Sequence, residues 1–269
     1  MGPGSTIRVE RDGPIARVTL ARPEVRNALN AELIADLHAT FDQLAAEPPE
    51  ALRAVVIAGD GATYCTGADV TWMRASLALS IEENEADAGR LAAMLESIDT
   101  CPVPVVARIH GAALGGGMGL CAVADIVLAA ADTAFGFTET RLGILPAIIS
   151  PFVLRRIGEG ASRALFVTGE RFGAGRALDI GLVHEVLPDD ATLDARLWAV
   201  LDELLAAGPT AVRAAKAVIL EQRGLEADQR RTLTVRAMAR QRTSVEGQEG
   251  LAAFLEKRHP SWRDDPDRS

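Results

Sequence analysis

Apolar and polar residues alternate at the start of the chain, in the pattern of a β-hairpin. The alternation runs over residues 6 to 20 and is interrupted by Asp12-Gly13, a pair typical of tight two-residue turns. A period of two places every second side chain on one face of a strand. The apolar positions concerned are Ile7, Val9, Ile15, Val18 and Leu20.

Helical spacing follows the hairpin. Asn30 can cap a helix whose apolar residues recur at intervals of three and four, and a second such run leads up to residue 98. Between them, Val55 to Ile57 predicts a short buried strand, ended by the turn-forming Gly59-Asp60-Gly61. The apolar helical positions are Leu33, Ile34, Leu37, Phe41 and Leu44, then Leu91, Met94, Leu95 and Ile98.

Beyond residue 100, short strands give way to helices alone. Strand-like runs occupy 103–109, 125–128, 134–137 and 182–187, and a glycine cluster occupies 115–119. From about 191 the helical pattern is nearly continuous to Leu255. This order predicts an α/β core over residues 6–195, followed by a helical C-terminal region over 196–269.

Composition narrows the classes of function. The formal net charge is −9, which argues against sequence-independent binding to nucleic acid, since that requires a basic face. No apolar run approaches the roughly 20 residues that span a bilayer, so we expect no membrane segment and a cytoplasmic location. Neither the four histidines nor the three cysteines (Cys65, Cys101, Cys121) have metal-site spacing, so we expect no metal and ordinary reduced cysteines.

Two glycine-containing segments are candidates for backbone chemistry. YCTGADV (64–70) and HGAALGGGMGL (110–120) each place small residues where strand-like chain meets a turn or helix start. Two backbone N–H groups that converge there on one oxygen would form an oxyanion hole. Each loop alone is also compatible with a tight turn or close packing. A dinucleotide loop is disfavoured, because Leu120 stands where the last glycine of GxGxxG belongs.

Five segments in order resemble the enoyl-CoA hydratase/isomerase (crotonase-like) superfamily, and they extend over almost the whole chain. Such a set is more specific than any single motif. The segments are RPEVRNAL (22–29), YCTGADV (64–70), HGAALGGGMGL (110–120), FTETRLGILPA (137–147) and EGLAAFLEKRHPSW (249–262).

The resemblance implies a fold, a substrate and an assembly. The fold is a spiral of ββα turns with a C-terminal helical region that mediates homotrimers, often paired into homohexamers. The substrate is an acyl-CoA, so that coenzyme A is part of the substrate and no separate cofactor is expected. By the same match, the amides of Thr66 and Gly116 bind the thioester oxygen.

The resemblance also assigns residues to the coenzyme A arm of the substrate. Five positions correspond to segments that line this arm, and two C-terminal ones to residues that reach it, sometimes in a neighbouring subunit. From local sequence alone, the cations among them would be ordinary surface residues. The positions are Arg26, Ala28, Gly67, Ala68 and Asp69, then Phe254 and Lys257.

Glu139 is the candidate catalytic carboxylate. It lies among apolar residues, and desolvation there would raise its pKa toward working pH. The alternative is a surface glutamate paired with Arg141. Many relatives carry a second glutamate two residues after GGG, but this chain has Gly119 there. The resemblance therefore implies a site with one carboxylate.

One carboxylate permits two reactions. Glu139 can pass a proton from water to C2 while the water oxygen attacks C3, or move a proton from C2 to C4. The stretches ADVTWMR (68–74), EENEADAGRLAAML (82–95) and RLGILPAIISPFVLRRIGEGASR (141–163) resemble a bacterial methylglutaconyl-CoA-type hydratase branch. Hydration is therefore favoured. A Δ3,Δ2-enoyl-CoA isomerase and a non-catalytic CoA-thioester binder remain open.

The first of these stretches also contains three residues of possible use near the site. Trp72 and Met73 are expected to shape the acyl pocket or simply to pack. Arg74 could meet a carboxylate on the substrate, but a position facing solvent is the favoured reading.

Overall fold

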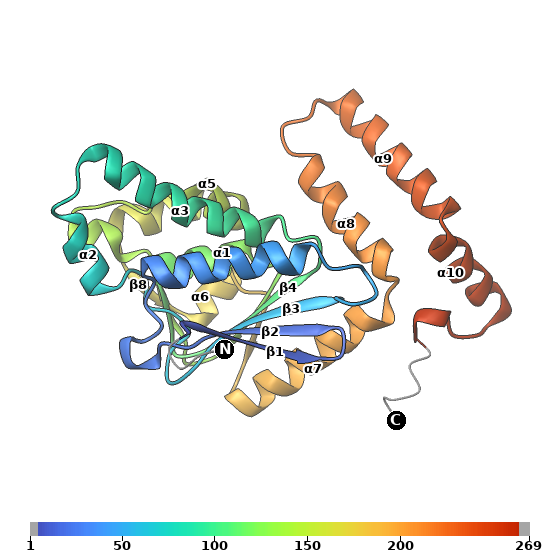
Figure 1. Cartoon of the computed structure of the whole chain (residues 1–269), viewed down its shortest axis with the longest axis horizontal. Coiled ribbons are helices and arrows are strands. Elements are labelled where there is room, and N and C mark those ends of the chain that lie inside the picture. Colours follow the sequence, from blue (N-terminus) through green and yellow to red (C-terminus); the bar gives the residue numbers. More distant parts are fainter. Residues whose placement is uncertain (1–4, 264–269) are drawn as a thin grey trace.

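A six-stranded sheet forms the centre of the molecule, and the computed structural model describes it within residues 5–263. The strands lie in the order β1-β2-β3-β4-β6-β9 (Figure 1). β1 and β2 form the antiparallel hairpin that the N-terminal alternation predicts, and the later pairs are parallel. The strands are β1 (Ile7–Asp12), β2 (Ile15–Leu20), β3 (Ala54–Gly59), β4 (Val105–Ile109), β6 (Ile126–Ala130) and β9 (Glu185–Leu187).

Helices cover both faces of this sheet, and the period-two pattern of β3 shows why. Val55 and Ile57 belong to the larger core, beneath α1 (Ala31–Ala45) and α3 (Ile81–Asp99). Val56 points the other way, into a second core with Leu193 and Leu197 of α7 (Asp190–Ala206). A central parallel strand therefore needs apolar residues on both sides, which explains its unbroken apolar run.

The predicted helix cap at Asn30 is confirmed. Its side chain accepts a hydrogen bond from the amide of Leu33 at 2.9 Å, and five apolar positions of α1 are buried. Helix α3 starts at a capping box in which the Ser80 hydroxyl and the Glu83 carboxylate bond each other's backbone amides. These caps fix the two helices that lie above the sheet.

A three-stranded sheet supports the middle of the chain. β5 (Ala112–Leu114) pairs in parallel with β7 (Ala134–Gly136), which pairs antiparallel with β8 (Arg171–Gly173). The remaining elements before β9 are the 3-10 helices η1 (Pro23–Val25) and η2 (Thr138–Leu142) and the helices α2 (Val70–Ser76), α4 (Gly116–Val123), α5 (Ser150–Thr168) and α6 (Ala174–Asp179). The sequence patterns gave no indication of α2, β5 or β8.

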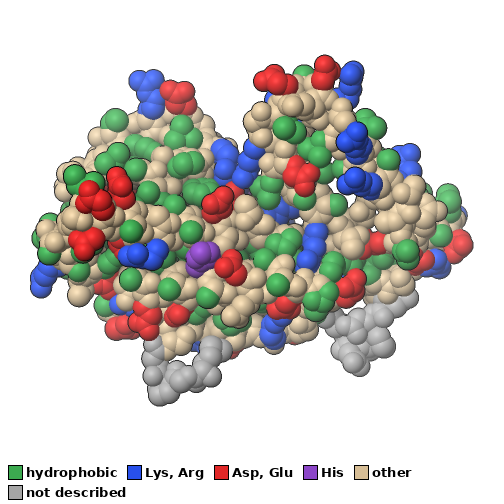
Figure 2. Space-filling model, turned by 45° about the horizontal axis from the view of Figure 1, so that its top comes forward, with side chains coloured by type: hydrophobic (Ala, Val, Ile, Leu, Met, Phe, Trp, Pro, Cys, Tyr) green, Lys and Arg blue, Asp and Glu red, His purple; other side chains and the backbone are tan. Residues whose placement is uncertain are grey.

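The C-terminal helices form an arm beside the core. α8 (Pro209–Glu221), α9 (Ala227–Thr243) and α10 (Val245–Glu256) project away from the sheet, and η3 (Ser261–Arg263) follows (Figure 1). Figure 2 shows this arm as a second lobe. Ion pairs anchor α8, from Lys216 to Asp125 and from Arg223 to Asp99, each at 2.6 Å.

The boundary predicted after residue 195 falls inside α7, whose apolar side chains are buried against the sheet as far as Leu201 and partly buried as far as Leu205. The packed core therefore continues through α7, and the arm starts with α8. The overall α/β class with a helical C-terminal region is confirmed.

Three buried cysteines complete the core. Cys65, Cys101 and Cys121 are free and buried, as expected from their spacing. Burial raises the pKa of the Cys65 thiol to about 12. Within residues 5–263, no helix combines the length and apolar character needed to cross a bilayer.

Candidate active site

The two glycine-containing segments meet in the structure. Cys65 pairs with Ala113 in an isolated parallel bridge, with its amide 3.1 Å from the Ala112 oxygen. Gly67 lies against the second segment, where a Cβ would come within 3.0 Å of the Leu114 oxygen and 3.4 Å of the Gly116 nitrogen. Its φ of +89° also favours glycine. Only a residue without a side chain allows these two loops to approach so closely.

The amide predicted at Thr66 is the wrong donor. Its N–H donates to the Arg26 oxygen at 3.2 Å, so it is not available to a ligand. The residues on either side of Ala68 both pair with Leu29. The Leu29 amide donates to the Gly67 oxygen at 2.7 Å, and the Asp69 amide donates to the Leu29 oxygen at 2.8 Å. This pairing leaves the Ala68 N–H without an acceptor in residues 5–263. Ala68, two residues further on, is therefore the available donor.

The amide of Gly116, the other predicted donor, is available to a ligand. This residue begins α4, where the first amides of a helix have no acceptor within the helix. The preceding amide, of Gly115, is used in the sheet, donating to the Gly136 oxygen at 2.9 Å. The Gly116 N–H has no backbone acceptor in the described part of the chain. Gly67 packs against the turn that contains Gly116, so the adjacent residue Ala68 lies close to the Gly116 amide.

Glu139 enters the same cavity from η2. A Cβ on Gly115 would lie 3.4 Å from its Oε1, which places the carboxylate beside the glycine turn. Its Oε2 is buried and has no hydrogen-bond partner among the described residues. Burial raises the pKa of Glu139, as predicted from its apolar surroundings. No ion pair with Arg141 is formed within residues 5–263, so the alternative of a surface ion pair is not supported.

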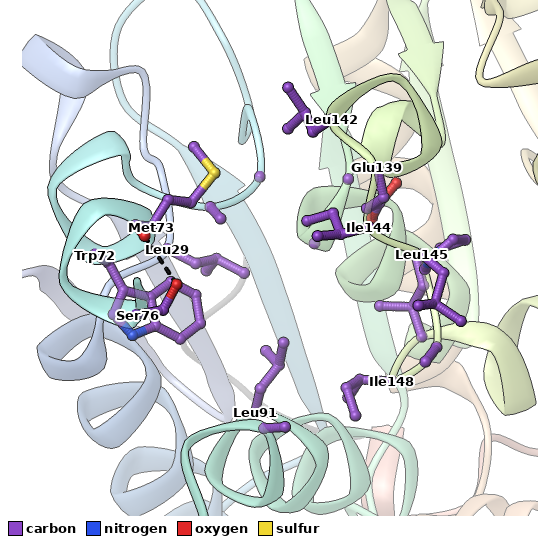
Figure 3. A pocket seen from close by; sticks show the side chains of 18 of the residues that line it. Leu29, Trp72, Met73, Ser76, Leu91, Glu139, Leu142, Ile144, Leu145 and Ile148 are labelled. Carbon is purple, nitrogen blue, oxygen red and sulfur yellow. Dashed lines mark hydrogen bonds between the residues drawn. The ribbon is translucent and has the colours of Figure 1, made fainter. Parts of the chain in front are cut away.

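These groups line one cavity of about 360 Å³. Figure 3 shows Trp72 and Met73 of α2 on one side and Glu139 with Leu142 and the following segment on the other. Leu91 of α3 lies between the two sides. The remaining labelled apolar side chains are Leu29, Ile144, Leu145 and Ile148. A reactive carboxylate and backbone donors thus face a mostly apolar chamber.

The place of a second carboxylate is filled by apolar side chains. A Cβ on Gly119 would come within 2.6 Å of Ile149 Cγ2 and within 3.3 Å of both Leu95 methyl groups. Ile149 and Leu95 are themselves buried. The absence of a glutamate at this position is therefore built into the surrounding packing.

The predicted coenzyme A residues in the N-terminal half divide into two groups. Gly67 and Ala68 line the cavity, whereas Arg26, Ala28 and Asp69 are not part of its wall. Asp69 has a structural role, because its carboxylate accepts from the Thr71 amide at 2.8 Å and from Arg22 at 2.9 Å. Burial opposes its ionisation, but these bonds outweigh it and lower the pKa of Asp69.

Phe254 and Lys257 lie outside the cavity of their own protomer. Phe254 is in the last turn of α10 and Lys257 is the C-cap of that helix, on the arm, and among the described residues none beyond 149 lines the cavity. The Phe254 side chain is exposed, and Lys257 has a φ of 55° at the helix end.

Sequence reasoning missed four polar residues of the cavity wall. They are Ser76 of α2, Asn84 and Asp87 of α3, and Thr138 of η2. Spacing offered a signal for α3, since residues 84, 87, 88 and 91 share one helical face. Among the described residues, no group of three His, Cys, Asp or Glu side chains is placed to hold a metal.

Comparison with known proteins identifies the family. The family model described as enoyl-CoA hydratase/isomerase matches residues 10–265. A putative enoyl-CoA hydratase of Thermus thermophilus is 33% identical over 95% of this chain and 100% of its own length. The structure of Pseudomonas aeruginosa AtuE superposes with a TM-score of 0.93, at 37% identity over 96% of this chain and 99% of that one. A Shewanella pealeana enoyl-CoA hydratase structure gives a TM-score of 0.90, at 33% identity over 96% of each chain. The chain belongs to the enoyl-CoA hydratase/isomerase family.

Proposed function

We propose that this protein hydrates the C2=C3 bond of a 2-enoyl-CoA thioester, with Glu139 as its single acid–base group. The observation that carries the proposal is the buried, unpartnered Oε2 of Glu139 in one cavity with the free amides of Ala68 and Gly116. A general base needs a pKa near working pH, and the burial of this carboxylate shifts its pKa in that direction.

The reaction uses the two amides and the carboxylate in turn. Water attacks C3, and the C2=C3 electrons move through C2 and the carbonyl carbon to the thioester oxygen. The N–H groups of Ala68 and Gly116 donate to the enolate oxygen formed there, and fixed donors of this kind need no reorganisation. Glu139 accepts the proton that water loses and returns it to C2. Both new bonds form on the face of the substrate next to Glu139.

Isomerisation is a second candidate, and the packing around Gly119 favours it specifically. Ile149 and Leu95 occupy the place where a second carboxylate would hold the attacking water. A lone carboxylate could instead remove a proton from C2 of a 3-enoyl-CoA and deliver it to C4. The same amides would stabilise the dienolate.

Absorbance of the conjugated enoyl thioester separates the two reactions. Hydration of crotonyl-CoA or a branched 2-enoyl-CoA removes the conjugated band, whereas isomerisation of a 3-enoyl-CoA creates it. We expect loss of the band with 2-enoyl substrates. If the band appears with 3-enoyl substrates and does not change with 2-enoyl substrates, the activity is isomerisation and not hydration. Binding of the thioester without either change would remove the enzymatic proposal.

We also propose that the arm assembles the protein into a homotrimer or homohexamer. Apolar side chains of α10 are exposed in the single chain: Val245, Leu251, Phe254 and Leu255. Burying them against another copy would remove apolar surface from water. Phe254 and Lys257 would then reach the coenzyme A arm bound by a neighbouring protomer. Light scattering of the purified protein measures the assembly state.

A further inference from the structure

Three polar side chains of α2 and α3 lie in the wall of the mostly apolar cavity that contains Glu139, here called the acyl chamber. Ser76 comes from the last turn of α2, and Asn84 and Asp87 come from the first half of α3. Asp87 is one helical turn before Leu91 and lies on the same face of α3. Figure 3 places Leu91 between the two side walls of the chamber. A substrate acyl group that occupies the chamber therefore meets this polar edge.

The hydrogen atoms of these polar groups are already used within the protein. The Ser76 hydroxyl donates to the Met73 oxygen at 2.8 Å, the bond drawn as a dashed line in Figure 3. The Asn84 amide group donates to the oxygens of Leu79 at 3.2 Å and Ser80 at 3.0 Å. What these residues offer to the chamber is oxygen lone pairs, which accept hydrogen bonds.

Asp87 adds a negative charge to this edge. It is a buried residue, and its Oδ1 accepts from Arg90 at 2.6 Å. The Arg90 side chain is more than half exposed and is not part of the chamber wall. The pair therefore presents its carboxylate to the chamber and its cation to solvent.

No positively charged side chain in the described part of the chamber wall balances the charge of Asp87. Among the described residues, the chamber wall contains Glu139 and Asp87 but no Lys, Arg or His. Arg74 of α2 is exposed and is absent from the wall, although its neighbour Met73 lines it. A substrate carboxylate at this edge of the chamber would be a further negative charge next to the acceptor oxygens of Ser76, Asn84 and Asp87.

From this arrangement we infer that the site selects acyl groups with an uncharged end and rejects those that end in a carboxylate, with Asp87 as a specificity-determining residue. The inference rests on the proposed hydration of 2-enoyl-CoA and specifies its substrate class. It separates this chain from the methylglutaconyl-CoA-type activity that parts of its sequence resemble, because a glutaconyl group carries a carboxylate. Rejection by a like charge is an established means of specificity.

Matched pairs of substrates test the inference. Each pair has the same number of acyl carbons: 2-pentenoyl-CoA with glutaconyl-CoA, and 2-hexenoyl-CoA with the mono-CoA thioester of 2-hexenedioic acid. We expect kcat/KM to be at least about tenfold lower for the carboxylated member, because like charges in a partly desolvated site repel strongly. Equal values within each pair would overturn the inference.

Variants of α3 test the role of Asp87 in opposite directions. Asp87→Asn should shift the ratio of the two kcat/KM values about tenfold toward the carboxylated substrate. Arg90→Gln should shift it the other way, since Asp87 then loses its partner. Glu85→Gln removes the same charge from an exposed site on α3 outside the chamber and is the control. An unchanged ratio in both Asp87→Asn and Arg90→Gln would contradict the role of Asp87.

Two further measurements keep this inference separate from the proposed function. If Arg74→Gln loses turnover of the carboxylated substrates, Arg74 binds the substrate carboxylate, and the inference is overturned. If the enzyme hydrates neither substrate, the proposed function fails. Calorimetric binding of pentanoyl-CoA and glutaryl-CoA then tests selection alone: weaker binding of glutaryl-CoA is expected, and equal affinity would overturn it.

Discussion

Replacing Glu139 by Gln removes the acid–base group and leaves the shape of the cavity unchanged. The carboxylate lies beside Gly115, and its Oε2 is buried without a hydrogen-bond partner among the described residues. The substitution therefore breaks no hydrogen bond of that oxygen. General acid–base catalysis contributes about 10²–10⁴-fold to a rate. We therefore expect kcat to fall by that factor, which corresponds to about 3–5 kcal/mol of activation free energy. Thioester binding should change little, because the amides of Ala68 and Gly116 remain.

The same substitution should not destabilise the fold at alkaline pH. Burial raises the folded-state pKa of Glu139 above that of the unfolded chain. The folded protein then binds the proton more tightly, so this contribution to stability is present at low pH and is lost as pH rises through the folded-state pKa. Glu139→Gln should therefore unfold at a temperature equal to or above that of the wild type at pH 8, and the difference should close toward pH 4.

The assay combines turnover of crotonyl-CoA with thermal unfolding at both pH values. Glu159→Gln, a matched change on the exposed face of α5, is the control and should retain wild-type turnover. The acidic limb of the wild-type kcat/KM profile should follow the raised pKa of Glu139. Turnover by Glu139→Gln within threefold of wild type would refute its role. Reduced activity together with a large loss of stability at pH 8 would indicate a structural role instead.

Four further substitutions, one of them a control, test the packing that builds the site. Asn27→Ala should lower the free energy of unfolding by about 2–4 kcal/mol, because this fully buried side chain makes three hydrogen bonds to backbone groups; urea denaturation measures it. Gly119→Ala should cost about 1–3 kcal/mol through overpacking against Ile149, whereas Gly89→Ala, in open space on α3, should stabilise by about 0.5–1 kcal/mol. Asp69→Asn should reduce stability at neutral pH, with the difference from wild type disappearing as pH falls through the lowered pKa of Asp69.

Each of these substitutions has an outcome that would contradict the structure. Wild-type stability of Asn27→Ala would mean that the hydrogen bonds of the Asn27 side chain to the backbone of Arg22, Asp60 and Thr63 are not formed. Equal effects at Gly119 and Gly89 would mean that Gly119 is not in tight contact with Ile149. A stability difference for Asp69→Asn that persists at low pH would assign the effect to helix packing rather than to the carboxylate charge.

Local patterns predicted the elements whose residues determine them directly. The hairpin turn and the Asn30 cap depend on neighbouring residues, and the sequence locates the cap correctly and the turn to within one residue, since Asp12 pairs with Ile15 and the loop is Gly13-Pro14. The short strands β5 and β8 have only three residues each, too few to show a period, and they exist because partners distant in the chain pair with them. Helix α2 is short and contains no buried residue, so no apolar period marks it.

Prediction of the site was limited in the same way, by contacts between residues that are distant in the chain. The motif located the correct loop, but which amide is free depends on Leu29, which pairs with both neighbours of Ala68. Likewise, the carboxylate of Asp69 is occupied by Arg22, a contact across 47 positions in the chain. A motif identifies a segment, whereas the availability of each donor and acceptor is settled by tertiary hydrogen bonds. Glu139 was singled out through the resemblance of its segment to the family, because its apolar neighbours alone are also compatible with a surface glutamate.

A crystal structure of the protein with butyryl-CoA, a saturated and unreactive thioester, tests the central claim most directly. We predict that the thioester oxygen lies about 2.7–3.1 Å from the amide nitrogens of Ala68 and Gly116, with the Glu139 carboxylate facing C2 and C3. A thioester oxygen that contacts neither amide, or an acyl chain that lies away from Glu139, would contradict the account.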